Sequence, residues 1–263
     1  MPEARETISF DRAAEFYDAT RDVGNDATAD TIEHLTTSLA GRGRLLEIGV
    51  GTGILAVPLA AHGLAVDGVD VSTEMLAKLR RKAPPGGHVR VVEADARRLP
   101  FREDSFGGAY LRHVFHLIPN WELAVSELCR VVGEGVILVD AGRQSGAFAE
   151  LWRSMSPALG PEAEPPGLVV ARDGEQALDD AFAASGATPD GTTLFSYPET
   201  ETIDDILDQM KRRSPSFTWT VSDEALDAAI EIARSWALER HGRLDVPLEE
   251  RFEVRWHRYK LGP

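Results

Sequence analysis

The sequence predicts a doubly wound α/β fold with a mostly parallel sheet of seven strands. Five short apolar runs alternate with helical patterns, and they lie at 44–49, 65–71, 88–95, 106–111 and 135–142. The first and last runs are apolar nearly throughout, as expected of strands covered on both faces. Helical patterns fill the intervals at 53–62, 72–82 and 119–132. This alternation favours right-handed crossovers and a ligand site at the carboxyl ends of the strands.

Capping residues mark where several of these helices begin and end. Ser72 follows the second strand and is a suitable N-cap, and Pro119 fits the first turn of the helix at 119–132. Upstream, the stretch 28–43 has apolar residues on one helical face and stops at Gly41. These signals place the helices between the strands without overlap.

The texture of the chain changes after about residue 143. We expect a loop rich in proline and glycine at 154–167, helices at 175–186, 201–213 and 222–242, and two last strands at 191–199 and 250–261. The chain is therefore interpreted as one domain, 1–263, with helical lid insertions. Its parts are an N-terminal helical cap (1–43), a cofactor-binding core (44–142), and the lid helices with the last two strands (143–263).

Composition and charge exclude some classes of partner. The formal net charge is −15 and the sequence pI is about 4.9, so the chain repels nucleic-acid backbones and anionic membranes at long range. A single cysteine, Cys129, allows no disulfide within the chain and no cysteine-rich metal site, and we expect no metal. The N-terminus is too charged for a signal peptide, so a cytoplasmic location is expected. The oligomeric state, monomer or homodimer, is left open.

The stretch "LLEIGVGTGILAV" (45–57) combines an apolar strand, three glycines and the start of a helix. Such an arrangement binds nucleotides. Ile54 occupies the place of the third glycine in the dinucleotide fingerprint G-x-G-x-x-G, which disfavours NAD. The phosphate-binding pattern G-x-x-x-x-G-K-[ST] does not occur in the chain either.

The segment "LEIGVGTG" resembles the first motif of class I S-adenosylmethionine-dependent methyltransferases. The resemblance continues at matching spacing, in "GVDVSTEML" (68–76), "VVEADARRLPFREDSFGGAYLRHVFHLIPN" (91–120), "ELCRVVGEGVILVDAG" (127–142) and the upstream "FDRAAEFYDATR" (10–21). It implies the Rossmann-like methyltransferase fold, S-adenosyl-L-methionine as cofactor and a small-molecule methyl acceptor, in the methyltransferase type 11-like branch. One departure is "VVGEGVI", where the family usually has a Pro-Gly-Gly turn.

The cofactor's methionine and ribose ends are expected at the first two strands. The turn formed by Gly49, Gly51 and Gly53 lets the backbone approach the methionine end, because no Cβ stands in the way. Glu47 is expected to help hold the ammonium group, directly or through water. Asp70 ends the second strand and would accept both ribose hydroxyls; its alternative role is to cap the following helix.

The adenine ring is expected between the second and third strands. Asp95 would accept from the adenine amino group, while Ala96 offers its backbone N–H to the ring. Val71 and Met75 would hold the ring's face. Asp95 as an ordinary loop acid and Met75 as a core residue are the alternatives. By resemblance, Tyr17 and Arg21 would close over the methionine carboxylate, unless they belong to a solvated helix.

The segment after the fourth strand supplies the candidates for chemistry. Methyl transfer needs mainly alignment of the reacting groups, and it needs a base only if the nucleophile carries a proton that it cannot lose unaided. His113 and His116 are the candidate bases; alternatively they line the pocket or bond to backbone. Arg112 is assigned to the cofactor site, where it either anchors an acidic substrate or is paired with Glu103 or Asp104.

Aromatic residues concentrate in the expected lid, under which the acceptor should enter. They line an apolar acceptor pocket or form the packing core of the lid, and they are Trp152, Phe217, Trp219 and Trp236. The leading hypothesis is transfer of a methyl group to O, N or C of a small molecule. The alternatives are an oxidoreductase that binds NAD(P)H, and a protein on the same scaffold that binds the cofactor as a sensor or structural partner without turnover.

Overall fold

The computed structural model describes residues 7, 11, 26–84, 86–142, 146–160, 163, 166–167, 174–219 and 221–262. Within these ranges the chain divides into two compact units. The first comprises 1–142, 166–195 and 254–263, and the second comprises 143–165 and 196–253. The assignment of 1–263 to one domain with a lid stays a prediction.

The sheet has seven strands in the order β3-β2-β1-β4-β5-β7-β6. Their bounds are β1 Arg44–Ile48, β2 Ala65–Asp70, β3 Val89–Glu93, β4 Gly108–Arg112, β5 Val136–Asp140, β6 Ala187–Glu201 and β7 Leu248–Leu261. The first five strands pair in parallel, and β7 runs antiparallel to β5. The predicted doubly wound, mostly parallel seven-stranded sheet is confirmed. The order of the strands changes direction between β1 and β4, so the carboxyl ends of β1, β2 and β4 lie together at one edge.

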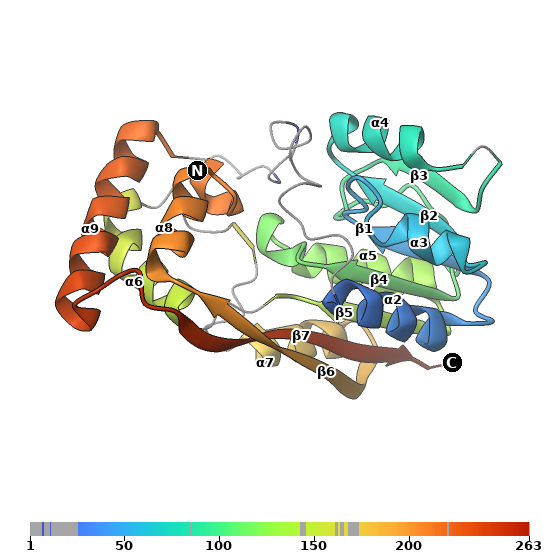
Figure 1. Cartoon of the computed structure of the whole chain (residues 1–263). Coiled ribbons are helices and arrows are strands. Elements are labelled where there is room, and N and C mark those ends of the chain that lie inside the picture. Colours follow the sequence, from blue (N-terminus) through green and yellow to red (C-terminus); the bar gives the residue numbers. More distant parts are fainter. Residues whose placement is uncertain are drawn as a thin grey trace, which may run out of the picture. The chain divides into compact units, whose positions relative to one another are not determined.

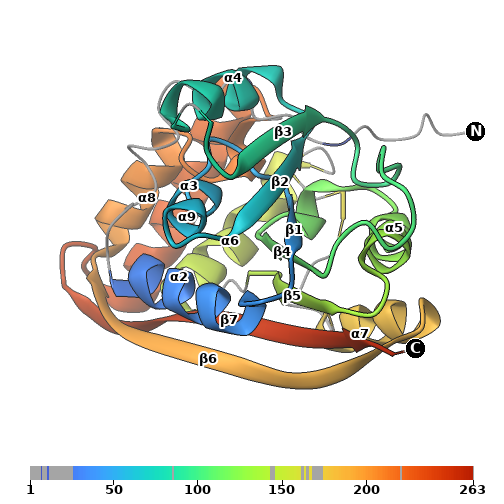
Figure 2. The same cartoon turned by 90° about the vertical axis from the view of Figure 1, so that its right-hand side faces the viewer.

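Helices cover both faces of the parallel strands, as Figures 1 and 2 show. On one side lie α2 (Asp26–Leu39), α3 (Ala56–Ala61) and α4 (Thr73–Lys82), and on the other lie α5 (Glu122–Val132) and α7 (Gly174–Ala184). Because both faces are covered, β1 and β5 are buried almost along their whole length. Cys129 lies on the buried face of α5, and its burial raises the pKa of the thiol to about 12.

The predicted N-cap of α4 is confirmed, and the predicted start of α5 is wrong. The Ser72 hydroxyl accepts the backbone N–H of Met75 at 3.1 Å, the usual capping bond. Pro119 lies three residues before α5, in the turn that follows a short 3₁₀ helix at Phe115–Leu117. The proline therefore stiffens the turn before α5 instead of opening the helix.

The second unit has a hydrophobic core of its own. The helices α6 (Gly146–Leu159), α8 (Ile203–Lys211) and α9 (Asp223–His241) supply most of it. Phe217 is buried in this core, and the centroid of its ring lies 4.2 Å from that of the Trp152 ring. Trp152 and Trp236 pack against the same cluster. Among the alternatives left open for these aromatic residues, the structure supports packing for these three.

The loop predicted at 154–167 is wrong in its first part, because α6 continues to Leu159 through Pro157. Its buried residues recur every fourth position, at Ala147, Leu151, Met155 and Leu159. Burying a continuous apolar stripe of this kind stabilises the helix by more than the loss of the single backbone hydrogen bond that a proline removes. None of the helices in the described part of the chain has the length and apolar character needed to cross a membrane.

Candidate functional site

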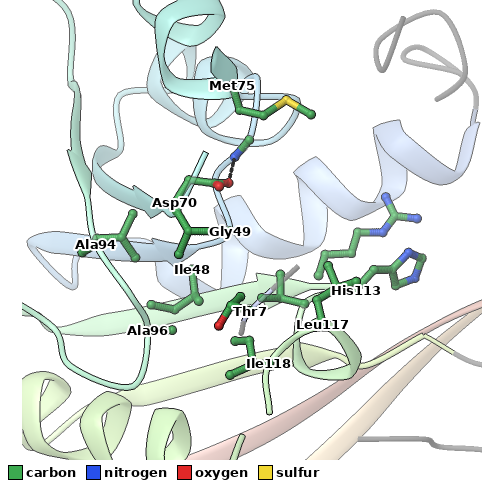
Figure 3. Close-up of a pocket in the computed structure, with 15 residues that line it drawn as sticks. Thr7, Ile48, Gly49, Asp70, Met75, Ala94, Ala96, His113, Leu117 and Ile118 are labelled. Atoms are coloured by element: carbon green, nitrogen blue, oxygen red, sulfur yellow. Dashed lines mark hydrogen bonds between the residues drawn. The ribbon is translucent and has the colours of Figure 1, made fainter. Parts of the chain in front are cut away.

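A cavity of about 630 Å³, part of it open to solvent, lies where β1, β2 and β4 end. The side chains and backbone that line it come from the first unit alone: Thr7, Ile48, Gly49, Gly51, Val69, Asp70, Val71, Met75, Ala94, Ala96, Arg112, His113, Val114, Leu117 and Ile118. Figure 3 shows Asp70 and Met75 on one side and His113, Leu117 and Ile118 on the other.

The three glycines after β1 have different roles, although all have positive φ. A Cβ at Gly53 would collide with the side chain of Leu79, and a Cβ at Gly49 would lie 2.6 Å from Val114. These two glycines therefore allow tight packing of the turn. Gly51 has a φ of 52°, and the nearest atom to a Cβ there is the Gly49 carbonyl oxygen at 3.9 Å. Gly51 thus leaves open space at the pocket, as a bound ligand requires.

Asp70 is held by the backbone on both sides. Its Oδ2 accepts the N–H of Gly51 at 2.9 Å, and its Oδ1 accepts the N–H of Ser72 at 2.8 Å. Burial raises the pKa of Asp70, and these backbone hydrogen bonds oppose that effect. The Val71 N–H acts on the carboxylate in the same direction, and since a carboxylate has about four acceptor positions, Asp70 can still accept from a ligand. The expected role as acceptor and the alternative role at the helix start are thus compatible.

Apolar side chains form a slot beside Asp70. Val71 and Met75 line it from the β2–α4 connection, and Ala94 and Ala96 line it from the segment after β3. Met75 is almost completely buried, so the expected pocket role and the alternative core role apply together. An aromatic ring fits between such walls, since they offer flat apolar contacts without a charge.

Asp95 does not line the cavity. Its carboxylate makes an ion pair with Arg97, with Oδ2 2.6 Å from Nη2, and its Oδ1 also accepts the Arg97 backbone N–H. The hydrogen bond and charge of Arg97 lower the pKa of Asp95. Its expected contact with an adenine amino group therefore stays a prediction, and the structure shows the carboxylate in another interaction.

Glu47 also lies outside the lining, buried within the sheet. Its Oε2 accepts the hydroxyl of Tyr110 at 2.7 Å. Burial raises the pKa of Glu47 to about 8, and the nearby charge of Asp70 acts in the same direction against the Tyr110 hydrogen bond. A carboxyl group that is mostly protonated at neutral pH is a poor partner for an ammonium ion, so direct contact with a ligand finds no support here.

His113 and Arg112 reach the cavity from the end of β4 and share one carboxylate behind them. The Asp140 Oδ2 lies 3.3 Å from His113 Nε2 and 3.2 Å from Arg112 Nε. Burial would raise the pKa of Asp140, but the charges of His113 and Arg112 outweigh it, and the pKa lies below its usual value. Arg112 is therefore paired with Asp140, and the alternative of a pairing with Glu103 or Asp104, which the sequence left open, is not what the structure shows.

The two candidate bases occupy different environments. His113 lines the cavity with its side chain 42% exposed, whereas His116 lies in the 3₁₀ helix outside the lining. Tyr17 and Arg21 lie outside the described residues. Gly53 is not among the residues that line the cavity. The structure thus brings together Gly49, Gly51, Asp70, Val71, Met75, Ala96, Arg112 and His113 from the predicted set.

Two polar residues at this site were missed from the sequence. Thr7 lines the cavity, and its buried hydroxyl has no hydrogen-bond partner among the residues that the structure describes. Asp140 is the last residue of the apolar strand β5. Its position offered a signal, because a carboxylate that ends a buried parallel strand lies at the ligand-binding edge of the sheet.

Comparisons with known proteins agree with this geometry. A family described as "Methyltransferase domain" matches residues 46–140, which include the glycine turn, Asp70, His113 and Asp140. Over residues 46–140 the chain is therefore similar to methyltransferase domains. The matched segment contains most of the residues that line the cavity.

Relatives and solved structures extend the likeness to the fold. Phosphatidylethanolamine N-methyltransferase of Cereibacter sphaeroides is 39% identical over 120 residues, 43% of this chain and 59% of that protein. Demethylmenaquinone methyltransferase of Thermus thermophilus is 39% identical over 116 residues, 42% of this chain and 53% of that protein. The chain thus matches little more than half the length of these relatives. The structure of a putative methyltransferase from Bacillus halodurans has a TM-score of 0.62 at 19% identity, over 90% of this chain and 99% of that one.

Proposed function

We propose that this protein transfers a methyl group from S-adenosyl-L-methionine to a small organic acceptor. The observation that carries the proposal is the turn-and-carboxylate arrangement, in which Asp70 is fixed by the Gly51 N–H and still has acceptor positions facing the cavity. A ribose with two adjacent hydroxyls matches these positions. The apolar slot of Val71, Met75, Ala94 and Ala96 matches an adenine ring.

The residues present fit this cofactor at its methionine end as well. Gly51 leaves space where a side chain would block the approach of a ligand to the turn. Thr7 offers, at the same cavity, a buried hydroxyl without a partner among the described residues. Tyr17 and Arg21 are proposed, from the resemblance, to cover the methionine carboxylate.

Bound there, S-adenosylmethionine supplies a methyl group on a positively charged sulfur, which leaves with the bonding electrons as a neutral thioether. The protein's contribution is to align the acceptor and, for an acceptor that carries a proton, to take that proton away. We assign the second task to His113, because it lines the cavity and His116 does not. Arg112 lies beside it and adds a charge that would orient an acidic group of the acceptor.

The acceptor itself is proposed only as a small organic molecule, methylated on O, N or C. The two relatives are named for methylation of phosphatidylethanolamine, an amine, and of demethylmenaquinone. A screen should therefore include amines, phenols and quinols together. Incubation with cofactor carrying an isotopically labelled methyl group is expected to give S-adenosylhomocysteine and a labelled product in equal amounts.

The control for this screen is His113→Gln, which keeps a polar side chain and removes the base. It is expected to bind S-adenosylhomocysteine as the wild type does and to turn over more slowly, by roughly the 10²- to 10⁴-fold that a positioned base contributes. Tight cofactor binding without a labelled product from any acceptor class would instead favour a sensor or structural protein on this scaffold.

A further inference from the structure

The carboxylate of Asp140 is more strictly fixed than a surface ion pair requires. Its side chain is 3% exposed, and its Oδ1 accepts the backbone N–H of Gly142 at 3.0 Å. The Oδ2 lies within ion-pair distance of Arg112 and His113 but in hydrogen-bond geometry with neither. One oxygen is therefore anchored by the backbone, and the other lies near the Arg112 guanidinium and the His113 imidazole.

The backbone also holds His113 against this carboxylate. His113 has a φ of 54°, in the left-handed region that residues other than glycine seldom adopt, and its N–H donates to the Asp140 carbonyl oxygen at 2.7 Å. Gly142 lies against the ring, since a Cβ there would be 2.8 Å from His113 Cδ2. An uncommon backbone conformation at a ligand cavity commonly serves a functional side chain. Here it brings the imidazole next to Asp140.

We propose that Asp140 is a positioning residue that holds the His113 imidazole with Nε2 protonated, so that Nδ1 is left to accept the acceptor's proton. The inference rests on the proposed methyltransferase function for the use of that proton. The reason is that Nε2 lies 3.3 Å from the carboxylate oxygen, within ion-pair distance, where a protonated nitrogen is favoured over a lone pair. Arg112 compensates the charge of the buried carboxylate at the same oxygen.

In the proposed step the acceptor's lone pair forms the bond to the methyl carbon, and the carbon–sulfur bond breaks with its electrons on sulfur. The proton released by the acceptor goes to Nδ1 of His113, which then carries a positive charge. Asp140 stabilises that charge through Nε2–H. The carboxylate stays ionised and does not touch the acceptor.

A double-mutant cycle tests this coupling. We expect Asp140→Asn to lower kcat by about ten-fold or more, as part of the effect of a positioned base, with an unchanged KM for the cofactor. In a His113→Gln background the same change should cost nothing further. Equal losses from Asp140→Asn in both backgrounds would overturn the inference. Wild-type kcat in His113→Gln alone would instead show that the base assigned under the proposed function is wrong.

A measurement that does not depend on turnover separates failure of the Asp140 inference from failure of the proposed methyltransferase function. Nitrogen NMR of the free wild-type protein should show His113 as the Nε2–H tautomer, and Asp140→Asn should lose this preference. An Nδ1–H tautomer in the wild type contradicts the inference even if Asp140→Asn does not fold. Asp204→Asn removes another arginine-paired carboxylate, the partner of Arg234, and should change neither the tautomer nor kcat.

Discussion

Asp70 accepts the backbone N–H of Gly51 at 2.9 Å, so the carboxylate that ends β2 is joined to the turn that follows β1. Both residues line the cavity, so this bond holds the acceptor oxygens and Gly51 together at that site. Parallel strands make it possible, because their carboxyl ends lie at the same edge of the sheet. The strand order therefore brings Gly51 and Asp70 together, and these two residues form part of the ligand site.

The glycine turn predicts that alanine at Gly51 mainly weakens ligand binding, whereas alanine at Gly53 mainly destabilises the fold. Gly51→Ala should weaken binding of S-adenosylhomocysteine strongly and cost only about 1–2 kcal/mol of stability, because its Cβ meets open space at positive φ. Gly53→Ala should destabilise the fold more, since its Cβ collides with Leu79 in addition to the positive φ. Calorimetric titration and denaturant unfolding of both variants measure the two effects. Equal binding losses at equal stability would contradict the division of roles.

The buried Glu47 predicts how stability depends on pH. Its pKa is raised from 4.5 to about 8 in the folded protein, so over this interval the folded state holds a proton that the unfolded state releases. The free energy of unfolding should therefore fall as pH rises, by up to about 1.4 kcal/mol per pH unit from this group.

Glu47→Gln is the variant that isolates this contribution. A glutamine keeps an oxygen to accept the Tyr110 hydroxyl and does not titrate. Between pH 5 and 8, the free energy of unfolding measured in urea should fall less steeply with pH in Glu47→Gln than in the wild type. Glu93→Gln changes an exposed acid on β3 and serves as the control. Parallel pH profiles for wild type and Glu47→Gln would show that Glu47 is ionised in the fold.

Cys129 should be unreactive in the folded protein. It packs on α5 against the core, and burial raises the pKa of its thiol to about 12, so almost no thiolate is present near pH 8. We expect a chromogenic disulfide reagent to label less than one-tenth of the protein in the time that labels free cysteine, and one thiol per chain after unfolding in guanidinium. Rapid labelling of the native protein would place Cys129 at an accessible surface.

The strands and helices were predictable because their signals are local. Alternating apolar runs indicated β1 to β5, and Ser72 marked the start of α4 from its own side chain. The two errors come from treating proline as a sufficient signal. At Pro157 the apolar stripe of α6 prevails, and at Pro119 the chain makes a turn before α5 begins.

The candidate site was predictable in part, for a physical reason. Gly51 and Asp70 belong to short motifs whose roles depend on local geometry, so the sequence indicates them. The partner of Arg112 was not predictable in this way, because Asp140 is 28 positions later on the neighbouring strand and only the pairing of β4 with β5 brings them together. The contact of Asp95 with Arg97 depends on side-chain conformations, which no spacing rule fixes.

The most direct test is calorimetric titration of the wild type and Asp70→Ala with S-adenosylmethionine, S-adenosylhomocysteine and NADH. We expect both sulfur compounds to bind to the wild type and NADH not to bind. We also expect a loss of about 100-fold or more in Asp70→Ala, since two hydrogen bonds to a charged group are removed, at about 1.5–3 kcal/mol each. Glu93→Gln should bind as the wild type does, and thermal unfolding should show that Asp70→Ala is folded. Binding of NADH alone, or unchanged affinity in a folded Asp70→Ala, would contradict the account.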